Sequence, residues 1–334
     1  MHYPMRRESS VAKPHVRNQP NRADLRDSLA TLATERVSER HPDLDLLSTA
    51  ELVGAMNEED AVVATAVALA SPAIAAAIDG IVGRMSTGGR LIYVGAGTAG
   101  RMGVIDASEA PPTFGTHPAQ VLGVIAGGPF AIQAAVENAE DDDIAGASDL
   151  RMLGVSAADA VIGISASGRT PYVLGAIEYA SSVGAFTAGI SCNSQSDLSQ
   201  AGDVAIDVVV GPEILTGSTR LKAGTAQKMV LNMLSTITMV RLGKTYLNLM
   251  VDMKATNEKL RARAERTVML ATHADAVDAA RVLNAVDGSV KAAILVLLTD
   301  LEPPTAIQVL AAHSGFLREA IGAAPACGRT LHGC

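Results

Sequence analysis

The stretch RLIYVGAGTAGRMGVIDASEAPPTFG, residues 90–115, decides the fold. Its apolar run Leu91–Val94 continues directly into a glycine-rich turn, Gly95–Gly100. A short apolar run followed by glycines is typical of a buried strand that enters a helix. The first amides of such a helix lack partners and lie at the positive end of the helix dipole, so the turn is suited to bind an anion such as a phosphate. Glu109 follows, and its carboxylate is a candidate acid or base.

Four more apolar runs follow the first one, and helical patterns separate them. The runs are Val121–Ala126, Ala160–Ile164, Phe186–Ser191 and Val204–Val210, and the helical segments are Thr98–Ser108, Phe130–Glu140, Thr170–Val183 and Gln195–Ala201. Strands that alternate with helices predict an α/β fold in which crossover helices join parallel strands. We therefore expect a three-layer αβα sandwich with a five-stranded parallel, flavodoxin-like sheet. In such sheets ligands bind at the carboxyl ends of the strands.

The segments on either side of the sheet are predicted to be mainly helical. Leu25–Glu39 has helical spacing, Ser48 and Glu51 form a capping-box pattern, and a longer helix is expected from Glu59 to Met85 with a break near Pro72. A long helix is also expected over 218–242. These patterns predict a disordered extension (1–24), an N-terminal helical region (25–88), the sheet domain (89–245) and a C-terminal helical region (246–334).

Composition narrows the classes of partner. The net charge of −8 and an aromatic content of 3%, with no tryptophan, argue against nucleic acid and anionic membranes. Three cysteines without metal or disulfide spacing indicate a reducing cytoplasm, and scattered histidines argue against a metal site. No apolar signal-peptide core is present in residues 1–22. The apolar stretch Ala61–Ile78 is mostly alanine and contains Pro72, so we expect a packed helix rather than a membrane span.

The glycine turn matches the dinucleotide pattern G-x-G-x-x-G, but a nicotinamide site also needs an acidic residue near the end of the second strand. None occurs between Glu109 and Glu137, which favours a sugar phosphate over a dinucleotide. A second candidate loop, Ser165–Thr170, follows the third strand and combines hydroxyl groups with the amides of the next helix. Either loop alone could be a tight turn or an N-cap. Two such loops at one sheet edge favour a phosphosugar without a cofactor.

The remaining candidates are charged side chains. Glu140 lies in the acidic run 137–143, which composition alone would make a solvated surface, with Asp141–Asp143 left as solvated. Together with Glu109 it could supply an acid and a base if burial separated their pKa values. Lys222 and Arg220 follow the fifth strand and could attract an anionic ligand, although solvent exposure is an equally good interpretation.

The chain resembles the N-acetylmuramic acid 6-phosphate etherase family, which belongs to the sugar isomerase (SIS) superfamily. The resemblance covers about residues 32–320. The matching segments are Tyr93–Arg101, Asp106–Thr113, Ala126–Gly128, Ala135–Asp141, Gly163–Tyr172, Gly189–Asn193, Lys222–Lys228 and Asn248–Asp252.

The resemblance implies a cofactor-free lyase that cleaves the D-lactyl ether of N-acetylmuramic acid 6-phosphate by elimination and then hydration. Glu109 would be the acid that assists lactate departure and then activates water, and Glu140 would be the base at sugar carbon 2. The phosphate would bind Ser165, Ser167, Arg169 and Thr170, with Gly97 and Thr98 near the sugar. The resemblance also implies a homodimer with sites near the interface, where Lys222 or a neighbour would act across it.

Two departures and two alternatives remain open. Ala99 stands where the family commonly has serine, which removes one hydroxyl contact, and Ala110 replaces a cysteine. A non-catalytic sugar-phosphate regulatory protein of the same superfamily would keep the loops but need not keep both carboxylates. An aldose–ketose phosphosugar isomerase is the other alternative, and the segments around Glu109 and Glu140 disfavour it.

Overall fold

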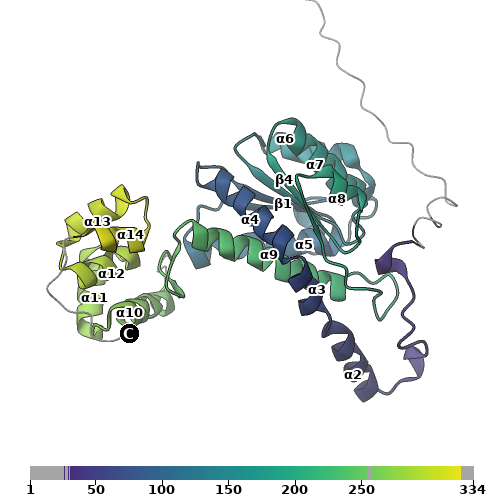
Figure 1. The fold of residues 1–334 in the computed structure, drawn as a ribbon, viewed down its shortest axis with the longest axis horizontal. Coiled ribbons are helices and arrows are strands. Elements are labelled where there is room, and N and C mark those ends of the chain that lie inside the picture. The colour runs from purple at the N-terminus through teal and green to yellow at the C-terminus, as the bar shows by residue number, and fades with distance from the viewer. Residues whose placement is uncertain (1–25, 27–28, 30, 254–256, 325–334) are drawn as a thin grey trace, which may run out of the picture.

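The computed structural model describes residues 26, 29, 31–253 and 257–324. Figure 1 shows a sheet-bearing part and a smaller group of C-terminal helices beside it. Five parallel strands form the main sheet in the order β2-β1-β3-β4-β5, which is the predicted flavodoxin-like order. The strands are β1 (Leu91–Gly95), β2 (Val121–Ile125), β3 (Ala160–Ile164), β4 (Phe186–Ser191) and β5 (Val204–Asp207).

The register of the strands aligns their carboxyl ends. Gly95 at the end of β1 pairs with Ile125 of β2 and with Ile164 of β3. Ile164 in turn pairs with Ile190 of β4. The loops that follow β1, β3 and β4 therefore begin at one level and share one edge of the sheet.

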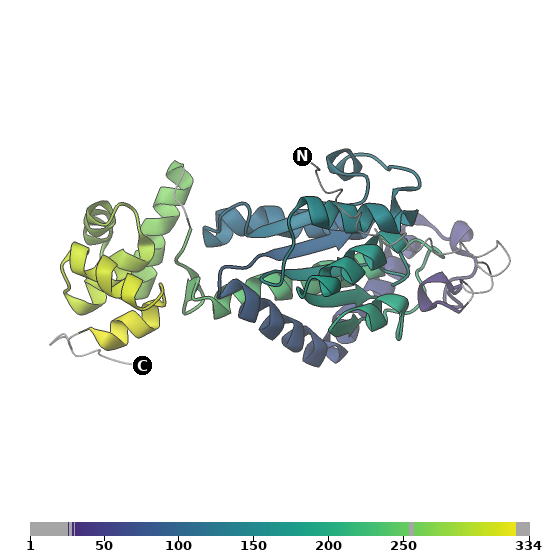
Figure 2. The same cartoon turned by 90° about the horizontal axis from the view of Figure 1, so that it is seen from above.

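Helices cover both faces of the sheet (Figure 2). One face packs against α4 (Ser71–Met85), α5 (Gly97–Phe114) and α9 (Lys222–Arg241) in a shared apolar core. The other face packs against α6 (Asp143–Met152), α7 (Pro171–Ser182) and α8 (Asp197–Ala201). The strands β1 and β3 are buried throughout, as expected for the centre of a three-layer sandwich. The predicted fold class is confirmed.

The helix α5 is longer than the sequence pattern indicated. It was expected to end near Glu109, but it continues through Pro111 and Pro112 to Phe114. Each proline removes one backbone donor, which is tolerated here because the helix ends within the next turn. Gly115 then adopts a left-handed conformation with φ of 62° and closes the helix by donating to the carbonyl of Pro111.

The predicted helix over 130–140 is wrong, the one over Leu25–Glu39 is right only at two described residues, and one predicted break is right. Within Leu25–Glu39, Arg26 and Leu29 are helical, whereas residues 33–35 form the 3₁₀ turn η1 (Ala33–Glu35). The segment 130–140 contains η3 (Pro129–Ile132) and η4 (Ala139–Asp141) instead of an α-helix. The break near Pro72 is confirmed, since α3 (Val63–Leu69) ends before α4 begins at Ser71.

The capping box at the next helix is confirmed in detail. The helix α2 (Thr49–Asp60) follows the short 3₁₀ turn η2 (Leu44–Leu46), and its N-cap is Ser48. The side chain of Ser48 accepts from the amide of Glu51, and the carboxylate of Glu51 accepts from the amide of Ser48 at 2.8 Å.

The C-terminal helices pack around an apolar core of their own. A short hairpin, β6 (Thr245–Tyr246) and β7 (Leu249–Met250), precedes these helices. The C-terminal helices are α10 (Glu258–Thr272), α11 (Ala276–Ala285), α12 (Val290–Thr299), α13 (Pro303–Ala312) and α14 (Leu317–Ala323). The proposed domain boundaries stay predictions, and the predicted disordered extension over 1–24 lies outside the described residues.

No single described helix is both long and apolar enough to cross a membrane. Two bent pairs reach that length and composition together, Thr49–Leu69 with Ser71–Met85 and Ala276–Ala285 with Val290–Thr299. The first pair contains the alanine-rich stretch that raised the membrane question in the sequence. Its residues Ile74, Ile78 and Ile81 belong to the apolar core below the sheet.

Candidate functional site

The loops after β1 and β3 flank the point at which the strand order reverses. The sheet order 2-1-3-4-5 places β1 and β3 side by side, while their connections leave in opposite directions. Ligands of open α/β sheets bind in the crevice at this switch point. The structure thus brings the two loops that the sequence singled out, 95–100 and 165–170, to one place.

The glycines of the first loop have two different roles. A Cβ on Gly100 would lie 2.6 Å from Cγ1 of Ile125 and 2.7 Å from the carbonyl oxygen of Gly95, so these glycines allow close packing of strand and helix. Gly97 has a φ of 52° and open space at its Cβ position. It begins α5, and the preceding Ala96 offers no side-chain cap. The first amides of α5 are therefore available to a ligand.

The second loop, residues 165–170, holds a group of converging hydroxyl groups. Oγ of the buried Ser165 lies 2.8 Å from Oγ1 of Thr170 and 3.3 Å from Oγ of Ser167. The amide of Gly168 donates to Oγ of Ser165 at 3.0 Å, and the amide of Arg169 donates to Oγ of Ser167 at 3.2 Å. The helix α7 starts next to this loop without a side-chain cap. Hydroxyls and helix amides together form a cradle that suits a phosphate.

Arg169 can add a positive charge to this cradle. Its guanidinium Nε lies 3.9 Å from a carboxylate oxygen of Asp197, and the two side chains are 38% and 58% exposed. An exposed ion pair of this length contributes little stability. The side chain can therefore turn from Asp197 toward a bound anion.

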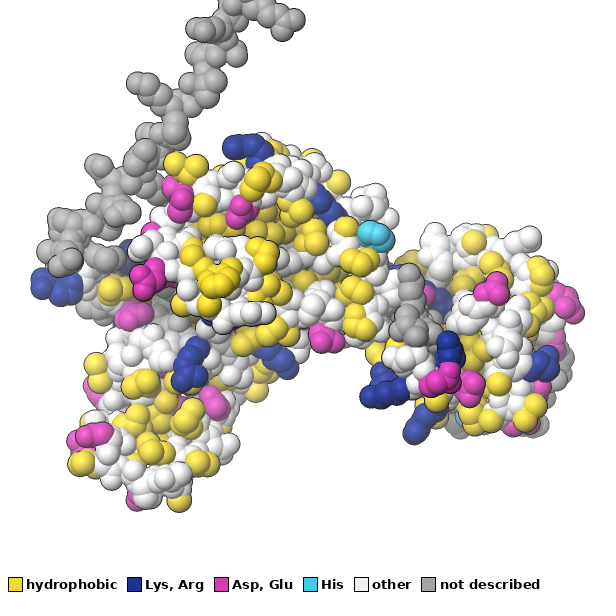
Figure 3. All heavy atoms as spheres, turned by 180° about the vertical axis from the view of Figure 1, so that it is seen from behind, with side chains coloured by type: hydrophobic (Ala, Val, Ile, Leu, Met, Phe, Trp, Pro, Cys, Tyr) yellow, Lys and Arg dark blue, Asp and Glu magenta, His cyan; other side chains and the backbone are white. Residues whose placement is uncertain are grey.

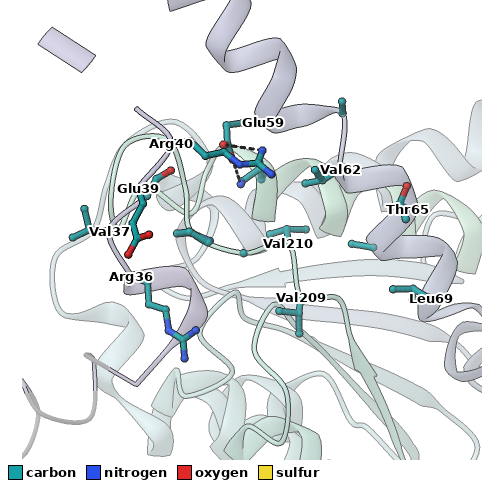
Figure 4. A pocket seen from close by; sticks show the side chains of 16 residues that line it. Arg36, Val37, Glu39, Arg40, Glu59, Val62, Thr65, Leu69, Val209 and Val210 are labelled. Atoms are coloured by element: carbon teal, nitrogen blue, oxygen red, sulfur yellow. Dashed lines mark hydrogen bonds and ion pairs between the residues drawn. The ribbon is translucent and has the colours of Figure 1, made fainter. Parts of the chain in front are cut away.

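Lys222 is the first residue of α9, and its side chain is buried. It forms an ion pair with Glu59, and both side chains are 4% exposed. Glu59 also accepts from Nη1 of Arg40 at 3.3 Å. Figure 4 shows Arg40 and Glu59 together at one end of a cavity of about 820 Å³, which Lys222 also lines. Its walls come from 36–40, α3 and the segment after β5.

The pair Glu59–Lys222 links segments far apart in the sequence, so breaking it should cost stability. Lys222→Met leaves a buried carboxylate with Arg40 alone, and we expect the free energy of unfolding to fall by about 3 kcal/mol. The double variant Glu59→Gln/Lys222→Met removes both charges and should lose less. Urea unfolding of the wild type, the single variant and the double variant measures the free energy of unfolding of each. Equal loss in the single and the double variant would contradict the expectation.

A second buried carboxylate holds the start of α9. Glu213 is fully buried and accepts from the amides of Lys222 at 3.0 Å and Ala223 at 2.9 Å. Burial raises the pKa of Glu213, while these two amides oppose the rise. Further along α9, a Cβ on Gly224 would lie 3.5 Å from Cγ2 of Thr98. The start of α9 is thus fixed beside the first loop.

The two candidate catalytic carboxylates lie on different elements, and both are exposed. Glu109 lies twelve residues after Gly97, which corresponds to about 18 Å along α5, away from the carboxyl edge. Glu140 lies on η4, which packs against α7, the helix that follows the loop 165–170. One protomer therefore does not bring Glu109 to the switch point. In the same acidic run, Asp142 does more than face solvent, since it accepts from the amide of Ala145 at 2.8 Å and caps α6.

Several residues of this edge had no role in the sequence interpretation. Glu59, Glu213 and Asn193 are buried polar side chains that join distant segments. Asn193 lies two residues after the end of β4, and that position was a signal that could have found it. Glu59 lies on α2, and nothing in the sequence around it indicates that it pairs with Lys222.

Other candidates agree with the simpler interpretation. Cys192 is fully buried, and burial raises the pKa of its thiol to about 12, so it is a small core residue. Within the described ranges, no group of three His, Cys, Asp or Glu side chains could hold a metal ion.

Comparison with known proteins gives consistent matches. Residues 73–181 match the glucokinase regulatory protein N-terminal SIS domain, and residues 138–237 match the SIS domain. The chain is 59% identical over 305 residues to the N-acetylmuramic acid 6-phosphate etherase of Streptomyces coelicolor, covering 91% of this chain and 98% of that protein. It is 58% identical over 301 residues to that of Streptomyces avermitilis, with 90% and 97% coverage. For the Brucella anthropi etherase the identity is 53% over 299 residues, with 90% and 97% coverage.

Proposed function

The chain belongs to the N-acetylmuramic acid 6-phosphate etherase family, and from that premise we propose which residues bind its substrate and which carry the reaction. It is a carbon–oxygen lyase that cleaves the D-lactyl ether of N-acetylmuramic acid 6-phosphate, giving N-acetylglucosamine 6-phosphate and D-lactate in amino sugar recycling. The observation that carries this function is similarity over nearly the full length of the etherases.

A regulatory role is the weaker candidate. The match to the regulatory protein's SIS domain covers residues 73–181 only. The etherases match about nine tenths of the chain. The presence of both carboxylates, Glu109 and Glu140, also supports an enzyme.

The loop 165–170 is proposed to bind the phosphate, and the first loop to face the sugar. Ser165, Ser167 and Thr170 supply hydroxyls, and Arg169 supplies charge. Gly97 and Thr98 lie on the neighbouring loop, where a sugar joined to that phosphate would extend. Lys222 contributes from the start of α9, which its buried ion pair with Glu59 helps to hold beside Thr98.

The chemistry needs an acid and a base but no further oxidant or reductant. In the open-chain sugar the aldehyde acidifies the neighbouring C–H, so a carboxylate can remove the proton at carbon 2. We assign this step to Glu140, because it lies on η4, which packs against the helix that begins directly after the phosphate loop. Glu109 donates a proton to the ether oxygen as the carbon 3–oxygen bond breaks, which releases D-lactate, and then takes a proton from the water that adds to carbon 3. Glu140 returns a proton to carbon 2, which completes N-acetylglucosamine 6-phosphate and restores both carboxyl groups to their starting states.

A homodimer would supply the Glu109 that one protomer does not place at its own site. α5 and the segment after β2 expose the large apolar side chains of Ile105, Phe130, Ile132 and Val136. Hydrophobic side chains gather on the sheet-bearing part in the view of Figure 3. An exposed apolar surface of this kind is typical of a protein–protein contact. We therefore propose that Glu109 acts across the interface, on substrate bound to its partner.

The cytoplasmic location that the cysteine pattern predicts suits this function, and it stays a prediction. Cell-wall amino sugars carrying a phosphate are charged small molecules, and a locally positive cradle inside a protein of net charge −8 would select them.

The function is tested by incubating the purified protein with N-acetylmuramic acid 6-phosphate and measuring D-lactate. We expect one D-lactate for each N-acetylglucosamine 6-phosphate formed. Sugar-phosphate binding without release of D-lactate at substoichiometric protein would favour the regulatory alternative instead.

The phosphate cradle predicts a specific loss of affinity. Ser165→Ala removes the hydroxyl that contacts Ser167, Gly168 and Thr170, and we expect KM to rise about tenfold while kcat changes less. Steady-state D-lactate release measures both. Ser182→Ala, at an exposed helical serine, is the control and should behave as wild type. A Ser165→Ala enzyme with unchanged KM would remove this loop from phosphate binding.

A further inference from the structure

The side chain of Asn193 joins three segments at the carboxyl edge of the sheet. It lies two residues after the end of β4 and is only 4% exposed. Its Nδ2 donates to the carbonyl oxygen of Ala166 at 3.0 Å and to Oγ1 of Thr34 at 3.1 Å. Its Oδ1 accepts from the amide of Ala33 at 2.7 Å. The amide orientation is fixed by these partners, since the N–H of Ala33 can only donate and the carbonyl of Ala166 can only accept.

The hydrogen bond from Asn193 to Ala166 supports the loop that forms the phosphate cradle. The carbonyl of Ala166 also accepts from the amide of Cys192 at 3.0 Å, so two donors hold it. Ala166 lies between Ser165 and Ser167, whose hydroxyls form the cradle. The direction of these hydroxyls therefore depends on the two hydrogen bonds that the carbonyl of Ala166 accepts.

The contacts with Ala33 and Thr34 fix the N-terminal turn, which we define as η1 (Ala33–Glu35). Thr34 is fully buried, although the turn is only three residues long and has no side-chain cap. On its far side the turn reaches the segment before α9, because a Cβ on Gly217 would lie 3.2 Å from Oε2 of Glu35. The turn thus extends from the phosphate loop toward the segment that packs beside Thr98.

We propose that Asn193 is a positioning residue for the sugar-phosphate site: its amide couples the N-terminal turn to the loop 165–170, and the turn forms one wall of that site. This proposal rests on the proposed function for its substrate, but its geometry is independent of the reaction. A chain segment some 160 positions away is held by one side chain. Loss of that side chain frees the turn and loosens the cradle together, and substrate affinity falls.

Two variants at Asn193 separate its contact with the N-terminal turn from its contact with the loop 165–170. Asn193→Ala removes both contacts, and we expect KM for N-acetylmuramic acid 6-phosphate to rise at least about tenfold, with kcat changing much less. Asn193→Asp keeps the acceptor for the amide of Ala33 but places a second acceptor against the carbonyl of Ala166. It should raise KM while leaving the turn in place. Thr34→Val removes only the hydroxyl contact and should raise KM less than Asn193→Ala does.

Trypsin cleavage after the exposed Arg36 reports the turn directly. We expect cleavage to be faster in Asn193→Ala than in wild type, and N-acetylglucosamine 6-phosphate to protect the wild type but not the variant. Asn193→Asp should be cleaved at the wild-type rate. Urea unfolding of each variant checks that the sheet domain is intact. If Asn193→Ala does not fold, the KM of Asn193→Asp and its rate of cleavage by trypsin test the proposed coupling by themselves.

The outcomes separate this proposal from the function on which it rests. If the wild type releases no D-lactate, the proposed function fails, while cleavage and binding of N-acetylglucosamine 6-phosphate still test the coupling. If the wild type is active and both Asn193 variants keep its KM, the coupling is refuted. A fall in kcat at unchanged KM would refute it as well, since the side chain would then act on the reaction and not on the wall of the site.

Discussion

Glu140→Gln is expected to lower D-lactate release by about 10²- to 10⁴-fold, because it removes the proposed base at carbon 2. Glutamine has nearly the same shape but cannot take a proton. The same variant should also stop the exchange of the carbon 2 hydrogen with solvent. NMR of the sugar phosphate in heavy water measures the exchange, and an enzymatic assay measures D-lactate.

The matched control is Glu137→Gln, an exposed glutamate in the same acidic run. It changes the local charge equally and should leave both rates near those of the wild type. If Glu140→Gln still exchanged the carbon 2 hydrogen at the wild-type rate, another group would be the base.

Glu109→Gln should lower D-lactate release to a similar extent but for another reason. It removes the acid that protonates the departing lactate, whereas the base remains, so carbon 2 exchange should continue. The two variants would therefore differ in exchange and agree in lactate release. Loss of exchange in Glu109→Gln would contradict this division of roles. Glu58→Gln, at an exposed glutamate on α2, serves as the control.

The position of Glu109 allows a test across protomers. If each site takes Glu140 from one chain and Glu109 from the other, a mixed dimer of the two variants contains one complete site. Random mixing of equal amounts should then restore about a quarter of the wild-type activity, given a closed two-fold dimer. If both residues act within one chain, no mixed dimer is complete and the mixture stays inactive.

The sheet could be predicted from the sequence because its strands are short apolar runs separated by helical patterns. The runs beginning at Leu91, Val121, Ala160 and Phe186 start where the observed strands start. Burial on both faces makes the central runs at Leu91 and Ala160 nearly continuous in hydrophobicity. The two loops were also found, because glycines and hydroxyls directly follow β1 and β3.

Predictions from the sequence failed where tertiary contacts override the local pattern. The helical spacing of Leu25–Glu39 does not continue as an α-helix through the N-terminal turn, where Asn193 binds Ala33 and Thr34 instead. The partner of Lys222 could not be foreseen either, since Glu59 lies 163 positions away. Pairings of this kind leave no trace in spacing or composition.

The catalytic assignment shows the same limit. Glu109 and Glu140 were chosen from local sequence and resemblance, but their separation in space depends on the length of α5. That helix runs through two prolines and holds Glu109 away from the carboxyl edge. We therefore propose that one chain supplies the binding loops and Glu140 and that the second chain supplies the acid.

The central claim is elimination at carbons 2 and 3, and product formed in heavy water tests it most directly. The purified protein is given N-acetylmuramic acid 6-phosphate in heavy water, and the products are analysed by mass spectrometry and NMR. We predict D-lactate together with N-acetylglucosamine 6-phosphate that carries deuterium at carbon 2. D-lactate accompanied by a product without deuterium at that carbon would contradict the mechanism.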